Sequence, residues 1–305
     1  MEISESLLET IKKCFPAEAI MPNEPMSRHT TFRVGGEAGM LLQVSTPEQL
    51  KVMIPLLNEQ KIPYFIKGNG SNLLVGDKGY DGIILEIGKE FGNIEVIGNL
   101  IVAGAGALMS SIAQEALKNS LTGFEFASGI PGTIGGGITM NAGAYDGELK
   151  DIVTKVEVIN SDGEVISLSN EEMNFGYRTS IIKQKPLIVT SVTLSLNNGD
   201  SAKIKARMDE LAAKRREKQP LEYPSAGSTF KRPEGYFAGK LIMDAGLRGY
   251  TVGGAQVSEK HCGFVINKGN ATAEDVYELI CDVQDKVKAR FGVALEPEVI
   301  FLGVF

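Results

Sequence analysis

Hydrophobic and polar residues follow one another in the first third of the chain in a pattern that predicts a strand, a helix and a second strand. The apolar run GMLLQV (39–44) predicts a short strand. Thr46 as N-cap and Pro47 as first helical residue are typical of a helix N-terminus. The apolar residues that follow at helical spacing are Leu50, Met53, Ile54 and Leu57, with Pro55 inside the pattern. Because IPYFIKG (62–68) predicts a second strand, we expect a βαβ unit with parallel strands.

The middle of the chain alternates more strongly and predicts antiparallel structure. Residues 99–119 predict a strand, a glycine turn and a helix. The runs IVTKVEVI (152–159) and EVISL (164–168) flank NSDG, which predicts a hairpin. Residues 187–196 predict a further strand with one polar side, and NNGDS (197–201) then indicates a boundary.

The last third of the chain differs from the first two thirds, because its hydrophobic pattern predicts two long helices. Residues 201–218 predict a helix that ends before Pro220. Thr272 is expected to cap a second helix, with Asp275 in the capping-box position and Gly292 beyond its end. The fold class expected is α+β in three parts: 1–88, 89–198 and 199–305.

Composition narrows the class of protein. Hydrophobic residues make up 43% of the chain and charged residues 23%, which is typical of a globular protein. The net charge of −7 argues against nucleic acid as a partner. The N-terminus does not resemble a signal peptide, and no segment predicts a membrane span. Three cysteines lie far apart without zinc spacing. We therefore expect a cytoplasmic protein with no bound metal and no membrane partner.

Glycine is more frequent than in an ordinary globular protein. It makes up 35 of the 305 residues, about 11%, where roughly 7% is usual. Many fall in three turns: KGNGSN (67–72), AGAGA (103–107) and SGIPGTIGGG (128–137). Positions 126–145 carry no charged side chain. A bare backbone of this kind allows N–H groups to approach a pyrophosphate, with hydrogen bonds added by Ser71, Asn72, Thr133 and Asn141. Ordinary tight turns are the alternative for any one loop, and the third glycine of a Rossmann fingerprint is missing after Gly106.

These motifs carry a family resemblance. KGNGSNLLVGDKGYDGIIL (67–85) and SGIPGTIGGGITMNAGAYDGE (128–148) resemble the FAD-binding fold of vanillyl-alcohol-oxidase-type flavoproteins. With FGYRTSIIK (175–183), YPSAGSTFKRP (223–233) and LEPEVIFLG (295–303), the chain resembles the UDP-N-acetylenolpyruvoylglucosamine reductase family. The resemblance runs from HTTFRVGG (29–36) to the C-terminus. It implies two FAD-binding lobes (1–88 and 89–198) and a substrate domain (199–305).

The resemblance also implies the cofactors and the residues that bind FAD. NADPH would reduce FAD, and the flavin would then reduce the enolpyruvyl group of a UDP-sugar in peptidoglycan precursor synthesis. The residues expected to hold FAD are Gly68, Asn69, Gly70, Ser71, Asn72, Gly129, Pro131, Gly132, Thr133, Gly135, Gly136, Asn141 and Gly143.

Three residues match the family's catalytic positions. Arg178 would clamp the substrate carboxylate as negative charge builds next to it. Glu298, beside an apolar run, would donate a hydrogen bond in its neutral form. Ser228 would protonate the substrate carbon. Taken without the motifs, each would be an ordinary surface or turn residue.

Substrate contacts are expected from a basic segment. Between Lys203 and Arg232 there are nine basic and four acidic residues, +5 in total, so the rest of the −7 chain carries −12. Such a segment suits a diphosphate, although a solvated helix face explains several of these charges. The residues expected to contact substrate are Tyr177, Arg215, Lys218, Lys231 and Arg232. His29 and His261 are assigned no role.

Two features limit what the resemblance implies. The short segment TSIIKQKPLIV (179–189) leaves no room for the insertion of the longer subfamily, so the chain resembles the shorter one. Ile300 stands where relatives commonly carry arginine. Two alternatives stay open: another flavin oxidoreductase of the same fold, such as a hydroxy-acid oxidase, and a non-catalytic nucleotide-binding protein. The oligomeric state is not predicted.

Overall fold

The computed structural model describes residues 3–305, and its contacts divide the chain into two compact units. Of the described residues, unit 1 comprises 3–22, 40–69 and 82–214, and unit 2 comprises 23–39, 70–81 and 215–305. Each unit is therefore assembled from segments far apart in sequence. The three-part division expected from the sequence stays a prediction.

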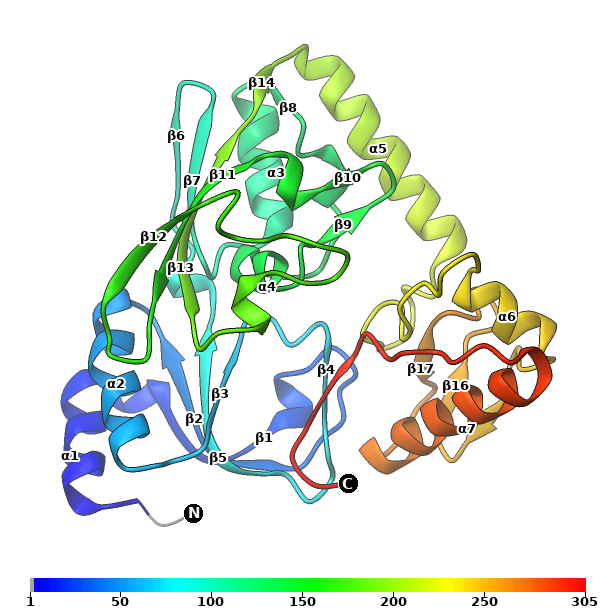
Figure 1. Cartoon of the computed structure of the whole chain (residues 1–305), viewed down its shortest axis with the longest axis horizontal. Helices are drawn as coiled ribbons and strands as arrows, with labels where there is room; N and C mark the ends of the chain where they lie inside the picture. The colour runs from blue at the N-terminus through cyan, green and yellow to red at the C-terminus, as the bar shows by residue number, and fades with distance from the viewer. Residues whose placement is uncertain (1–2) are drawn as a thin grey trace. The chain divides into compact units, whose positions relative to one another are not determined.

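The first sheet, most of which belongs to unit 1, includes the two strands of the predicted strand–helix–strand segment (Figure 1). Its strand order is β1 (Ile20–Pro25), β2 (Glu37–Val44), β5 (Tyr80–Ile87) and β3 (Tyr64–Lys67), with α1 (Glu5–Cys14) and α2 (Pro47–Glu59) in the same part of the chain. Thr46 and Gln49 form a reciprocal capping box at the start of α2, which runs through Pro55. The two predicted strands are not neighbours, since β5 lies between them and pairs in parallel with β3.

The second sheet of unit 1 is antiparallel throughout. Its order is β12 (Val165–Ser169), β11 (Val153–Ile159), β13 (Ile188–Ser195), β7 (Leu100–Gly104) and β6 (Ile94–Ile97). The predicted hairpin is confirmed as β11 and β12. Since both neighbours of β7 are antiparallel to it, the glycine turn between β7 and α3 (Met109–Lys118) does not belong to a Rossmann βαβ unit.

Shorter elements connect these sheets in unit 1. They are the pair β8 (Leu121–Thr122) and β14 (Asn197–Asn198), the pair β9 (Gly143–Ala144) and β10 (Gly147–Glu148), and helix α4 (Ile134–Thr139). Single 3-10 turns cover Ala17–Ala19, Lys89–Phe91, Glu125–Ala127, Leu149–Asp151 and Ile181–Lys183 in unit 1, and Met26–Arg28 in unit 2. Helix α5 (Ser201–Lys218) has its first part in unit 1 and its last four residues in unit 2.

Unit 2 packs two helices with a small sheet. Its elements are β15 (Thr251–Val252), β16 (Ala255–Val257), β17 (Val265–Asn267), α6 (Ala238–Asp244), α7 (Ala273–Phe291) and the parallel pair β4 (Leu73–Val75) and β18 (Ile300–Leu302). The capping box of Thr272 and Asp275 is confirmed at the start of α7, and Gly292 ends it with φ 70°.

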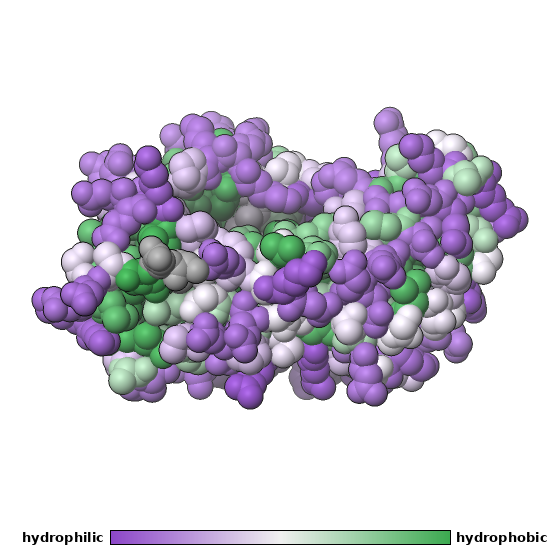
Figure 2. Space-filling model, turned by 90° about the horizontal axis from the view of Figure 1, so that it is seen from below, coloured by the Kyte–Doolittle hydropathy of each residue, from purple (hydrophilic) through white to green (hydrophobic). Residues whose placement is uncertain are grey.

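Each unit has its own hydrophobic core. The core of unit 1 includes the predicted α2 residues Leu50, Met53, Ile54 and Leu57. In unit 2, Phe32, Val34 and Leu74 from the early chain join Leu279, Ile280 and Val283 of α7. Hydrophobic residues on the face drawn in Figure 2 lie in separate groups among hydrophilic ones. None of the helices in residues 3–305 combines the length and apolar character needed to cross a membrane.

Candidate flavin and substrate site

Two of the three predicted glycine turns lie against each other in unit 1. A side chain at Gly68 would overlap the hydroxyl of Thr133, so glycine allows this approach without a shift of Thr133. The amide of Asn69 donates to the Pro131 carbonyl at 2.6 Å. The turn after β3 is thus bonded directly to the uncharged segment before α4.

The third turn is tied to the same segment by backbone hydrogen bonds. The N–H groups of Ile134 and Gly135 donate to the carbonyls of Ala107 and Ala105 at 2.8 and 2.9 Å. A Cβ at Gly135 would lie 2.9 Å from that of Ala105. Glycine therefore keeps these backbones close together.

The residues of this cradle fit a cofactor that carries a pyrophosphate. Glycine at the contacts lets the three turns pack backbone against backbone, and no charged side chain lies between positions 126 and 145. Thr133 caps α4 through its hydroxyl, which accepts from Gly136 N–H at 3.4 Å. Backbone N–H groups suit phosphate oxygens without a bound cation.

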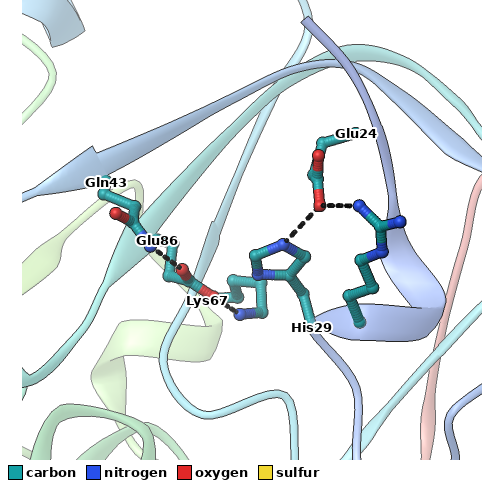
Figure 3. Close-up of polar contacts among 6 residues, drawn as sticks. Glu24, His29, Gln43, Lys67 and Glu86 are labelled. Carbon is teal, nitrogen blue, oxygen red and sulfur yellow. Dashed lines mark hydrogen bonds and ion pairs between the residues drawn. The ribbon is translucent and has the colours of Figure 1, made fainter. Parts of the chain in front are cut away.

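A buried ion pair stands at the end of β3, directly before the first turn. The side chain of Lys67 is only 3% exposed and pairs with Glu86, which also accepts from Gln43 at 3.2 Å (Figure 3). Burial lowers the pKa of Lys67, and the attraction of Glu86 opposes that shift. The sequence motifs do not point to this pair. A lysine at the end of an apolar strand was the available signal.

The remainder of the first turn, Gly70 to Asn72, belongs to unit 2. Gly70 has φ +64° and lies against the carbonyl of His29. The ring of His29 contacts Glu24 at 3.1 Å (Figure 3). Arg28 lies 3.6 Å from the same carboxylate. This histidine therefore has a structural partner.

Two of the predicted catalytic residues lie on adjoining backbone segments of unit 2. Glu298 donates its backbone N–H to the carbonyl of Thr229, next to Ser228, at 2.8 Å. Asn72 donates its amide to the Glu298 carbonyl at 2.9 Å. Ile300 begins β18 and donates its N–H to Asn72 O at 3.0 Å.

Ser228 lies exposed on a rigid turn. Gly227 before it has φ +74°, and Thr229 after it is fully buried. The Thr229 hydroxyl accepts from Val265 N–H at 2.9 Å, and its N–H donates to Gly263 O at 2.8 Å. The exposed hydroxyl is therefore carried by a buried, hydrogen-bonded neighbour.

The predicted substrate-binding cations of unit 2 have different surroundings. Lys231 pairs with Glu296. Arg232 lies over the exposed ring of Phe237, 4.0 Å from its centroid, and donates to Tyr236 O at 3.2 Å. Arg215 and Lys218 lie in the last turn of α5, where Lys218 is exposed.

Arg178 and Tyr177 lie in unit 1, at the centre of a tight turn. Arg178 has φ +55°, and its guanidinium donates to Gly143 O at 3.3 Å. The guanidinium also lies 5.2 Å from the centroid of the Tyr177 ring, which is half exposed. A positive φ at arginine marks a strained conformation that the surrounding contacts must hold.

Comparison with known proteins identifies the family to which the chain belongs. Residues 38–169 match the FAD binding domain family, and residues 219–302 match the C-terminal domain of UDP-N-acetylenolpyruvoylglucosamine reductase. The reductase of Caldanaerobacter subterraneus is 52% identical over 99% of both chains. The chain belongs to the UDP-N-acetylenolpyruvoylglucosamine reductase family. A reductase of this family from Clostridium botulinum is 54% identical over 93% of both chains.

Solved structures agree with the family. The crystal structure of the Thermus caldophilus reductase has a TM-score of 0.79 and 38% identity, and the match covers 92% of this chain and 97% of that one. A variant of the glucose oxidase Phl p 4, at 12% identity and a TM-score of 0.50, shares the fold alone. The α+β fold is thus the FAD-binding fold of the vanillyl-alcohol-oxidase type with a reductase C-terminal domain.

Membership of this family makes the protein an FAD-dependent oxidoreductase of peptidoglycan precursor synthesis. NADPH as reductant is consistent with the family. In residues 3–305 no group of three or more His, Cys, Asp or Glu side chains is arranged to hold a metal ion.

Proposed function

We propose that the protein reduces UDP-N-acetylglucosamine enolpyruvate to UDP-N-acetylmuramate, with NADPH as reductant, in the cytoplasm. The observation that carries the proposal is the hydrogen bond from Glu298 N–H to Thr229 O. It sets the acid Glu298 beside the segment that bears Ser228, as a reaction needing both a charge stabiliser and a proton donor would require.

FAD would be held by the glycine turns and their neighbours. In unit 1 the proposed contacts are Gly68, Asn69, Gly129, Pro131, Gly132, Thr133, Gly135, Gly136, Asn141 and Gly143, and in unit 2 they are Gly70, Ser71 and Asn72. Both N–H groups of the Asn141 amide donate inside the protein, and its backbone N–H donates to Ile138 O at 3.3 Å, so Asn141 would contribute by fixing the shape of the cradle. Bound there, FAD would supply the redox chemistry, by which two electrons from NADPH would reach the substrate double bond as hydride.

The protein's own residues would stabilise the negative charge that develops on the substrate and would supply the proton. Addition of hydride to the methylene carbon leaves negative charge beside the substrate carboxylate, where Arg178 would bind both oxygens. Glu298 in its neutral form would donate a hydrogen bond to the same charge. Ser228 would give its proton to the adjacent carbon, which completes the saturated product.

Binding of the UDP group would use the cations at the end of α5 and after Ser228. Lys218 and Arg215 suit the two phosphates, with Lys231, Arg232 and Tyr177 as further contacts. The exposure of Lys218 supports this assignment.

The experiment compares Ser228→Ala with Ser225→Ala, a control in the same motif. In Ser228→Ala, flavin reduction by NADPH should continue, while substrate-dependent NADPH oxidation should fall about 10²–10⁴-fold through loss of the proton donor. Ser225→Ala should keep both steps. Full turnover by Ser228→Ala would remove the proton-donor assignment. Absence of flavin absorption in protein supplied with FAD would contradict the whole proposal.

A further inference from the structure

The turn that carries Arg178 is fixed to the segment predicted to cradle FAD by three separate contacts. Gly176 and Thr179 close the turn by exchanging backbone hydrogen bonds at 3.0 and 3.3 Å, which leaves Tyr177 and Arg178 at its tip. The segment against which the turn lies is 139–143, and all of these residues belong to unit 1.

Asn141 makes the first contact. Its side chain is fully buried, and its amide donates to the Gly176 carbonyl at 3.1 Å and to the Glu148 carboxylate at 2.6 Å. The amide oxygen accepts from Lys150 N–H at 2.9 Å. The residue itself has φ +45°, a conformation that asparagine adopts more readily than most side chains. One amide thus joins three backbone segments.

Ser180 and Gly143 supply the other two contacts. The hydroxyl of Ser180, fully buried, donates to Thr139 O at 2.9 Å just after the turn. Gly143 O accepts from the Arg178 guanidinium at 3.3 Å. The turn is therefore held at its start, at its end and at the arginine head group.

We infer that Asn141 and Ser180 are positioning residues that set the orientation of Arg178 toward the substrate carboxylate. The inference rests on the catalytic role proposed for Arg178. A strained residue at the tip of a turn keeps its conformation only while its surroundings hold it. Without the Asn141 amide or the Ser180 hydroxyl, the turn relaxes and the guanidinium loses its alignment.

The test uses Asn141→Gly and Ser180→Ala in the FAD-containing enzyme. Glycine fits the positive φ of Asn141 and removes its side chain with the amide, while Ser180→Ala removes only a hydroxyl. We expect the rate of the substrate-dependent step to fall about tenfold to hundredfold in each, since a misplacement of about 1 Å costs rate on that order. In Ser180→Ala, which alters a residue outside the proposed FAD contacts, FAD content and the rate of flavin reduction by NADPH should stay within about twofold. Equilibrium affinity for UDP-N-acetylmuramate, measured by calorimetry without NADPH, should also change less than about twofold, because the arginine acts mainly as charge develops.

Thr190→Val is the matched control, because Thr190 is also buried in unit 1 and donates its hydroxyl to a carbonyl, that of Glu157, at 3.1 Å. It should keep the substrate-dependent rate. If Arg178→Ala is slow but both Asn141→Gly and Ser180→Ala turn over at the wild-type rate with melting temperatures unchanged, the inference is overturned. If Arg178→Ala itself turns over normally, the role proposed for Arg178 fails instead. Equal losses in flavin reduction and in the substrate step would indicate a general structural defect and would also overturn the inference.

Discussion

At the scale of single residues, polar side chains near the glycine turns are used to hold backbone in place. Asn72 donates to the Glu298 carbonyl, Asn141 to that of Gly176, and Thr229 accepts from Val265 N–H. Buried polar groups are costly unless they are hydrogen-bonded, so each of these bonds also fixes a conformation. The shape of the site therefore depends on side chains that need not touch a ligand.

His261 is a residue whose ionisation should affect stability. Its ring is half-buried against Phe264, with centroids 5.1 Å apart, and its Nδ1 accepts from Gly263 N–H at 3.1 Å. Burial lowers the pKa of His261 below its ordinary 6.5, against a smaller opposing effect of its backbone hydrogen bond. Between the lowered pKa and 6.5, the unfolded chain binds more protons than the folded one, so stability rises with pH in that window and falls on acidification.

We expect His261→Gln to flatten that dependence. The free energy of unfolding, measured by urea titration at pH values from about 7.5 down to about 5, should decrease less steeply in the variant than in the parent protein, because glutamine does not titrate. Values at pH 7.5 serve as the reference for any loss unrelated to ionisation. Parallel curves for the two proteins would show that His261 does not couple to folding.

At the scale of elements, local signals predicted the helices and strands well. The capping residues of α2 and α7, the end of α5 and the β11–β12 hairpin lie where the sequence indicated. Each depends on residues within a few positions of one another, where turn and cap chemistry acts.

Pairings between distant segments were not predicted. Strands β4 and β18 pair through Leu73 and Ile300, and β4 is three buried residues with no alternation to reveal a partner. The position of β5 between β2 and β3 was also not predicted. Within the candidate site, motifs named Arg178, whereas Ser180 and Lys67 were missed because their partners, Thr139 and Glu86, lie 41 and 19 residues away.

The contact between two glycine turns offers a test at this scale. Gly68→Ala places a Cβ against the Thr133 hydroxyl, so either that hydroxyl leaves its capping position or the turn after β3 and the start of α4 separate. We expect FAD affinity, measured by fluorescence titration of the stripped protein, to fall about tenfold or more through the lost alignment of backbone N–H groups.

Gly88→Ala is the matched control, because a Cβ there has nothing within 4 Å and the residue has φ −101°. It should bind FAD as the parent protein does. Equal FAD affinity in Gly68→Ala and the parent would show that the two turns do not have to meet for the cofactor to bind.

At the scale of the molecule, chain segments far apart in sequence build each unit. Unit 2 takes residues 23–39 and 70–81 into a unit otherwise formed by the C-terminal third, and Phe32, Val34 and Leu74 lie in its core. The match to the FAD binding domain, residues 38–169, includes residues of both units. Each unit is therefore complete only when segments from distant parts of the chain have come together. A ligand that binds the folded protein should stabilise it measurably.

FAD should raise the melting temperature of the whole protein, and a flavin without the pyrophosphate should do so far less. A ligand that binds only the folded state at about 100 times its dissociation constant adds about 2.7 kcal/mol, which corresponds to a shift of about 5 °C for a chain of this size. The measurement is a thermal melt of stripped protein with FAD or with riboflavin at the same concentration. Riboflavin shares the ring system but offers nothing to the uncharged segment between positions 126 and 145, which the cradle assigns to phosphate. If riboflavin stabilised the protein as much as FAD, the ring system alone would account for binding and the glycine cradle would have another purpose.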